Sequence, residues 1–368
     1  MSYYIPYCST VEVQRPSHII EARALDPLGL DPLIAILPLA NEWGDVDRIK
    51  EPLSFIGAAA RSGWLASLST AETWAALRDT DVLASSMQHH GRDPVVEVGG
   101  LEQAFVGMSE SLGLRVSRAP IAAYIGAHPT EEGRRRLFTV FTKDETAFVA
   151  NLQTSYDSLD RTVARLSTAD FAFHSAKQLA LRLAAARTAY GVMHQSVLNV
   201  EDQVDNTIFT KRIQPFFPRL TIRGEEFYAA GGSHLPAAVL DEFIRGDRGT
   251  PDGRHQEYVA TVTPYLTPRQ AAMLVAFKKR NGESFTSFIL REDSPLSEAD
   301  RLLLEERLTR TLAMSTRMRG RHLRLVKDSF ELREEASTGS GGGDYASTRR
   351  IAEANRDAYH EVRPARQA

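Results

Sequence analysis

The sequence predicts an all-α fold, and two observations support this prediction. Apolar residues recur at spacings of three and four along most of the 368 residues, whereas the two-residue alternation of half-buried strands is almost absent. Three stretches also match a helix start, with Ser or Thr followed three residues later by Glu or Asp: Ser69–Glu72, Thr142–Glu145 and Ser297–Asp300. A parallel-sheet enzyme is therefore not expected.

The N-terminal region, residues 1–125, is expected to be a small helical unit. Helices are predicted over residues 27–40, 48–61, 70–87 and 101–112, and Gly113 ends the last of them. Residues 91–100 are expected to form a loop, with a short strand considered at 95–98. Residues 1–25 show little periodicity.

The C-terminal region, residues 126–368, is expected to be a larger helical domain. Residues 219–227 suit a turn or short hairpin, and two small-residue loops are expected at 229–233 and 337–343. Helices are predicted over residues 142–166, 169–198, 204–214, 236–245, 256–265, 268–279, 298–330 and 346–359.

Composition excludes several classes of partner. The formal net charge of −3 provides no field that would attract nucleic acid or an anionic membrane. Cys8 is the only cysteine, so neither an internal disulfide nor a cysteine metal cluster is expected. Residues 1–14 lack the pattern of a signal peptide, and the most apolar stretch, 27–40, is too short to span a bilayer. We therefore expect a soluble cytoplasmic protein.

Few motifs point to catalytic chemistry. The glycines at 339–343 are not followed by the Lys-Ser/Thr of a P-loop, and no strand precedes them as in a dinucleotide fingerprint. On composition alone this loop is a linker to the last helix. The ten histidines contain no HExxH or other metal-ligand spacing, and no GxSxG nucleophile motif occurs.

His322 is the main candidate for a binding residue. It lies within an apolar helical face that includes Met314, Met318, Val326 and Phe330, and the flanking basic residues are Arg317, Arg319, Arg321 and Arg324. An imidazole on an apolar wall can ligate a haem iron, and nearby guanidiniums can meet its propionates. The alternative is a core histidine bonded to a backbone carbonyl, on a helix with a solvated basic side.

Nine stretches occur in a characteristic order between residues 20 and 360: Gly63-Trp64, Trp74 to His90, Gly91 to Pro94, Val98 to Glu102, Phe209 to Phe217, Gly231 to Ser233, Leu240 to Gly246, Arg319 to Leu323 and Gly339 to Gly342. In these stretches the chain resembles the haem-dependent indoleamine and tryptophan 2,3-dioxygenase superfamily, most of all its monodechloroaminopyrrolnitrin synthase branch. The resemblance implies a helical haem domain of the dioxygenase type, with haem b as cofactor and an aromatic substrate and O2 as partners.

The resemblance also implies roles for individual residues. His322 corresponds to the proximal haem ligand, Arg319 to an arginine at a propionate, and Phe209 to a distal aromatic that packs on the substrate. Asn151 and Ser233 are candidates for hydrogen bonds to oxygen. Two loops complete the implied site: Gly231, Gly232 and Ser233 over the distal haem face, and Gly339, Ser340, Gly341 and Gly342 over the substrate pocket.

One departure bears on the substrate. The dioxygenases carry an arginine five residues after the distal phenylalanine, where it clamps the substrate carboxylate; here that position is Gln214, which cannot form the bidentate ion pair. The expected function is haem-dependent oxidation or rearrangement of an indole- or tryptophan-derived substrate in secondary metabolism. The alternatives are a haem- or ligand-binding protein without turnover and a helical scaffold without cofactor.

Overall fold

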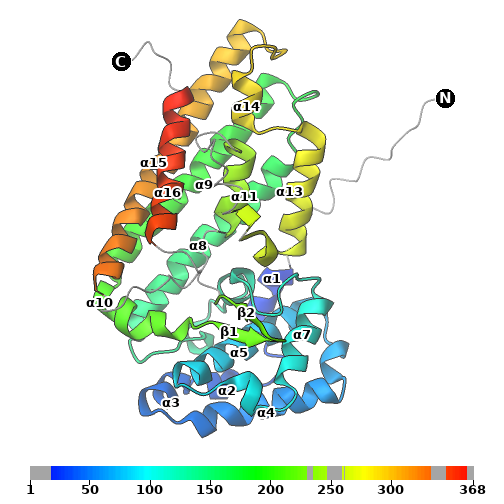
Figure 1. Cartoon of the computed structure of the whole chain (residues 1–368), viewed down its shortest axis with the longest axis vertical. Helices are drawn as coiled ribbons and strands as arrows, with labels where there is room; N and C mark the ends of the chain where they lie inside the picture. Colours follow the sequence, from blue (N-terminus) through cyan, green and yellow to red (C-terminus); the bar gives the residue numbers. More distant parts are fainter. Residues whose placement is uncertain (1–17, 230–234, 247–258, 261, 333–344, 363–368) are drawn as a thin grey trace, which may run out of the picture.

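The computed structural model describes residues 18–229, 235–246, 259–260, 262–332 and 345–362. It is mostly helical, and two parts follow one another along its long axis (Figure 1). One part contains α1 to α7, with the small hairpin β1–β2 beside them. The other is a bundle of longer helices, among them α8, α9, α13, α15 and α16.

The N-terminal part is built from short helices around one longer, buried helix, α5. Its capping box is confirmed: the Ser69 hydroxyl accepts from Glu72 N, and the Glu72 carboxylate accepts from Ser69 N. The elements are α1 (His18–Glu21), η2 (Ala22–Ala24), α2 (Asp31–Ile34), α3 (Leu37–Trp43), α4 (Val46–Arg61), η3 (Trp64–Ser67), α5 (Thr70–His89), α6 (Pro94–Glu97) and α7 (Leu101–Ser111).

Two predictions for this part are wrong. The single helix expected over 27–40 is interrupted between α2 and α3, because Pro38 in the first turn of α3 has no backbone N–H to donate to the carbonyl of Ile34. The strand considered at 95–98 is instead α6, a single helical turn. The Asp93 carboxylate caps this turn by accepting from Val95 N at 2.9 Å and Val96 N at 3.2 Å.

Buried ion pairs connect α5 to the rest of the N-terminal part. Arg78 and Asp79 are fully buried neighbours, and Arg136 from a distant loop donates to the Asp79 carboxylate at 2.8 Å. Arg118 donates to Asp81 at 2.8 Å and to the carbonyls of Pro218 and Phe227, which flank the β-hairpin. These contacts fix the hairpin against α5, although Pro218 lies 100 residues after Arg118 in the chain.

The C-terminal part is organised around the long helix α15, which packs against both α9 and α16 (Figure 1). The Thr311 hydroxyl donates to the Leu183 carbonyl of α9 at 3.1 Å, and Ser315 donates to the Asn355 carboxamide of α16 at 2.8 Å. After α7 the chain continues, through the hairpin that lies beside the N-terminal part, with η4 (Ala122–Gly126), η5 (Glu132–Arg134), α8 (Thr142–Ser167), α9 (Ala176–Gln203), α10 (Asn206–Ile208), η6 (Phe209–Ile213), η7 (Gln214–Phe216), β1 (Leu220–Ile222), β2 (Glu225–Phe227), α11 (Leu235–Ile244), η8 (Thr263–Tyr265), α13 (Pro268–Asn281), α14 (Phe285–Leu290), α15 (Glu298–Glu331) and α16 (Tyr345–Val362).

The structure corrects three predicted helix starts and ends. The capping box at Thr142 is absent, because the Glu145 carboxylate turns back to accept from Phe138 N at 2.7 Å and Thr139 N at 2.9 Å. Helix α9 begins at Ala176 rather than 169, behind a capping box formed by Ser175 and Gln178. The helix expected over 204–214 is α10 followed by a π-helical turn and a 3-10 turn.

Other predictions are confirmed. The hairpin pairs Leu220 with Phe227 in antiparallel register, and its turn places Arg223 and Gly224 at positive φ. Helices α4, α7, α11, α13, α15 and α16 lie within a few residues of their expected bounds. The Ser297 cap of α15 is also present, since Asp300 N donates to its hydroxyl at 3.2 Å.

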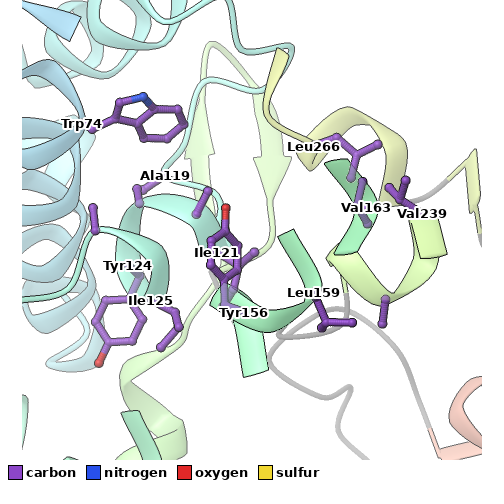
Figure 2. Packing of buried hydrophobic residues seen from close by; sticks show 14 of the residues in the cluster. Trp74, Ala119, Ile121, Tyr124, Ile125, Tyr156, Leu159, Val163, Val239 and Leu266 are labelled. Carbon is purple, nitrogen blue, oxygen red and sulfur yellow. The ribbon is translucent and has the colours of Figure 1, made fainter. Parts of the chain in front are cut away.

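One continuous apolar core runs through both parts. Figure 2 shows Ile121 and Tyr156 between the N-terminal part and the bundle, with Val163, Val239 and Leu266 gathered beside them. The boundary expected between residues 125 and 126 falls inside η4, within this core. None of the described helices has the length and apolar character needed to cross a lipid bilayer.

Candidate functional site around His322

His322 lies near the middle of the second half of α15, one turn after Arg319. His322 is half-buried and lies four residues after the fully buried Met318. Burial lowers the pKa of His322 to about 4, and the charge of Arg319 adds to this effect. The imidazole is therefore neutral at neutral pH, which is the form that ligates a metal.

The face around His322 is less uniform than the sequence predicts. Met318 is buried, but Met314, Leu325 and Val326 are half-buried, and the side chain of Phe330 lies outside the described part of the structure. The four arginines expected around His322 also differ in their burial and in their partners. Arg317 and Arg324 are exposed, Arg321 pairs with Glu201 of α9 at 2.5 Å, and Arg319 is buried.

Arg319 is part of a buried polar cluster that joins three helices. Its guanidinium donates to the Asp241 carboxylate of α11 at 2.7 Å, and the Tyr190 hydroxyl of α9 donates to the other oxygen at 2.5 Å. Arg319 is 3% exposed and Asp241 1%. Burial, together with the charge of Asp241, raises the pKa of Tyr190 well above its ordinary value, so the phenol stays protonated and keeps donating.

A second guanidinium belongs to this cluster. Arg245, directly after the end of α11 and one turn after Asp241, is 1% exposed, and burial lowers its pKa while the nearby Asp241 partly opposes that effect. The positive charge of Arg319 lowers the pKa of Arg245 further. Sequence reasoning missed Tyr190, Asp241 and Arg245 as a group. The available signal was the pair of adjacent carboxylates, Asp241 and Glu242, in the otherwise apolar helix Leu235–Ile244.

The predicted distal residues lie on α8 and on the turns after α10. Phe209 is half-buried in η6, and its ring centroid is 4.7 Å from that of Phe148 on α8. Asn151, one turn after Phe148, donates to the Ala147 carbonyl at 2.8 Å and accepts from Asn199 of α9 at 3.0 Å. Asn151 therefore joins α8 to α9 as well as standing near the aromatic pair.

Gln214 opens the 3-10 turn η7 and is half-buried. Its side-chain oxygen is buried and accepts no hydrogen bond from any residue that the structure describes. The amide is thus positioned by its backbone turn rather than by a side-chain partner.

Hydrogen bonds bring these elements to one end of the bundle. Arg321 contacts Glu201 near the end of α9, and Ser329, two turns after His322, donates to Asn206 of α10 at 2.7 Å. Helix α10 leads directly into Phe209. These contacts therefore bring three segments close together: the part of α15 that contains His322, the end of α9 and the turn that contains Phe209.

Seven predicted site residues lie outside the described residues: Gly231, Gly232, Ser233, Gly339, Ser340, Gly341 and Gly342. Among the described side chains, no group of three His, Cys, Asp or Glu is arranged to hold a metal ion. A haem iron needs only one axial imidazole, so this observation does not bear on His322 as a haem ligand. No protein-family model matches the chain.

Proposed function

We propose that the chain is a haem-binding oxidoreductase with a fold of the indoleamine 2,3-dioxygenase type. Its proposed substrates are O2 and an indole- or tryptophan-derived aromatic compound. The observation that carries the proposal is the neutral, half-buried imidazole of His322, one turn from the buried Arg319. A neutral imidazole on a partly apolar helix face could ligate the iron of haem b.

The basic cluster also suits the anionic edge of a haem. Arg319 and Arg245 are guanidiniums in a dry environment, where a carboxylate contact is strong. Asp241 already holds one side of Arg319. A haem propionate would therefore share Arg319 with Asp241 rather than meet a free arginine, and Asp241 acts as a positioning residue.

When bound, haem would supply the redox chemistry that combines O2 with an electron-rich ring. The chain would hold and orient the reactants. Phe209 and Phe148 offer an aromatic wall against which a flat ring can stack. Gln214 offers a buried hydrogen-bond acceptor but no positive charge. It therefore suits a substrate N–H, such as that of an indole, better than a free carboxylate.

The test of haem binding is absorption spectroscopy. Haemin added to the purified protein should produce a shifted Soret band at one equivalent, and His322→Ala should greatly weaken it. His194→Ala is the matched control, because His194 is a half-buried histidine of α9 that faces Arg317 and Arg321 from the next helix. Equal spectra for the wild type and His322→Ala, or no haem uptake by either, would refute the proposal.

A second candidate function is haem or ligand binding without turnover. It is favoured by Gln214, which removes the carboxylate clamp of the dioxygenases, and by the commitment of Arg319 to Asp241. Incubation of the reduced, haem-loaded protein with O2 and a panel of indoles decides between the two. Formation of an oxidised product from any of them excludes pure binding, and failure of every indole supports it.

A further inference from the structure

A cavity of about 370 Å³ lies apart from the cluster around His322, where the N-terminal part meets the bundle. Arg115, from the segment after α7, forms one wall. Glu242 of α11 and Lys278 of α13 form another, and Val259, Ala260, Thr263 and Pro264 complete the lining. Its volume falls within the range of small-molecule sites, which is roughly 300–1,000 Å³.

The charged residues of this cavity are unequally paired. Lys278 contacts the Glu242 carboxylate at 2.5 Å, and Glu242 is only 4% exposed, so this pair is held in place. Arg115 is exposed and makes no ion pair with any residue that the structure describes. Among the described residues of the lining, Arg115 is therefore the cation that has no ion pair.

The remaining lining is largely apolar, from Val259, Ala260 and Pro264. The Thr263 hydroxyl donates to the Val259 carbonyl at 2.5 Å and so remains an acceptor toward the cavity. A guanidinium beside an apolar wall recognises a planar carboxylate that carries an apolar body. A phosphate dianion fits less well, because it would need a second free cation and Lys278 is already paired.

We propose that this cavity binds a small monoanionic carboxylate with an aromatic or aliphatic body. Arg115 forms the ion pair with the carboxylate, and Val259, Ala260 and Pro264 cover the body. This site is independent of the proposed haem chemistry. The two sites are both connected to helix α11, because Asp241 binds Arg319 near His322 and the next residue, Glu242, binds Lys278 at the cavity.

The experiment is calorimetric titration of the full chain with sodium benzoate, benzamide and inorganic phosphate at one ionic strength. Benzoate should saturate one site, and Arg115→Gln should weaken it roughly fivefold, as for a partly exposed ion pair. Benzamide should bind more weakly than benzoate by a similar factor. Arg187→Gln, an exposed arginine of α9 outside the lining, should bind benzoate like the wild type.

A second variant separates loss of the site from loss of folding. Ala260→Trp fills the cavity from an exposed position, so it should abolish benzoate binding while thermal unfolding stays unchanged. The same titration on His322→Ala should give the wild-type affinity, which keeps this result separate from any failure of haem binding. Absence of benzoate binding, equal affinity for benzamide, tighter binding of phosphate, or an unaffected Arg115→Gln would each overturn the proposal.

Discussion

Individual residues show how far the interior departs from an apolar core. Arg78, Arg118 and Arg136 have no exposed side-chain surface, yet each meets a carboxylate. Their charge by itself predicts a solvent-exposed position. They can be buried because carboxylates elsewhere in the chain pair with them. Breaking one such pair leaves an unpaired charge in the protein interior, which destabilises the fold.

Asp241 offers the sharpest test of this effect. Asp241→Asn should lower the free energy of unfolding by about 3–5 kcal/mol, because Arg319 would keep its buried charge without a counter-ion. Urea unfolding followed by circular dichroism measures it. Glu306→Gln is the control, since Glu306 pairs with Arg310 at half-exposed positions and its loss should cost under about 0.5 kcal/mol. Similar small losses for both variants would contradict the prediction.

Glu145 should make stability depend on pH. Burial raises its pKa from 4.5 to about 7, against the effect of three hydrogen bonds from Phe138 and Thr139. Between these values the folded state keeps a proton that the unfolded state has released. The contribution of Glu145 to stability therefore falls as the pH rises from about 4.5 to 7 and changes little above that.

The measurement compares the wild type with Glu145→Gln in urea at several pH values. The wild type should lose on the order of 2 kcal/mol relative to the variant between about pH 5 and pH 8. His322 acts in the opposite sense, because its lowered pKa means that its contribution is complete above 6.5 and lost toward 4. Both proteins contain His322, so its effect cancels. Parallel pH profiles would show that Glu145 ionises normally.

At the scale of elements, close backbone contact decides where helices can cross. Helix α4 meets the start of α7 at Gly57, Gly99 and Gly100. A Cβ atom on Gly57 would lie 2.3 Å from the Gly99 carbonyl oxygen, and one on Gly100 would lie 2.4 Å from the Gly57 oxygen. These atoms are backbone and cannot rotate away. The glycines therefore permit the crossing of α4 and α7.

Gly57→Ala should destabilise the fold by about 1–3 kcal/mol, since the two helices must separate to admit the methyl group. Gly107→Ala in α7 is the matched control, because that position is exposed and nothing lies within 4 Å of the added Cβ. It should stabilise by about 0.5–1 kcal/mol through helix propensity. Thermal unfolding of the two variants should move in opposite directions, and an equal shift would refute the steric argument.

At the scale of the whole molecule, the shared core predicts cooperative unfolding. Residues from the N-terminal part and the bundle belong to one apolar cluster, seen where Ile121, Tyr156 and Leu266 approach in Figure 2. Neither part can lose its packing without exposing apolar surface of the other. The hairpin strengthens this connection, because Arg118 holds carbonyls on both sides of it.

The three tryptophans allow this to be measured. Trp43, Trp64 and Trp74 all lie in the N-terminal part, so tryptophan fluorescence reports that part, whereas far-ultraviolet circular dichroism is dominated by the long helices of the bundle. The two signals should follow a single urea transition. A fluorescence transition at a lower urea concentration would show that the N-terminal part unfolds independently.

Local sequence patterns were sufficient to predict the all-α fold class and the positions of most helices. The ends of α5, α13 and α15 could be predicted because a cap residue, a proline or an apolar repeat acts within a few neighbours. The same motif failed at Thr142, since Ser69 and Thr142 match one pattern but Glu145 has stronger donors in residues 138–139. A sequence pattern cannot predict that the backbone N–H groups of residues 138–139 will compete for the Glu145 carboxylate, because the folded loop alone brings them close to it.

The candidate site, too, could be predicted from the sequence only in part. The sequence by itself determined a helical protein with one imidazole, His322, on a largely apolar stretch of its longest described helix. Tertiary structure decided the rest. Arg319 was expected at an accessible rim but is buried against Asp241, 78 residues away, with Tyr190 on the same carboxylate. The physical reason is that helical periodicity acts over a few residues, whereas the environment of a charge depends on which distant helix packs against it.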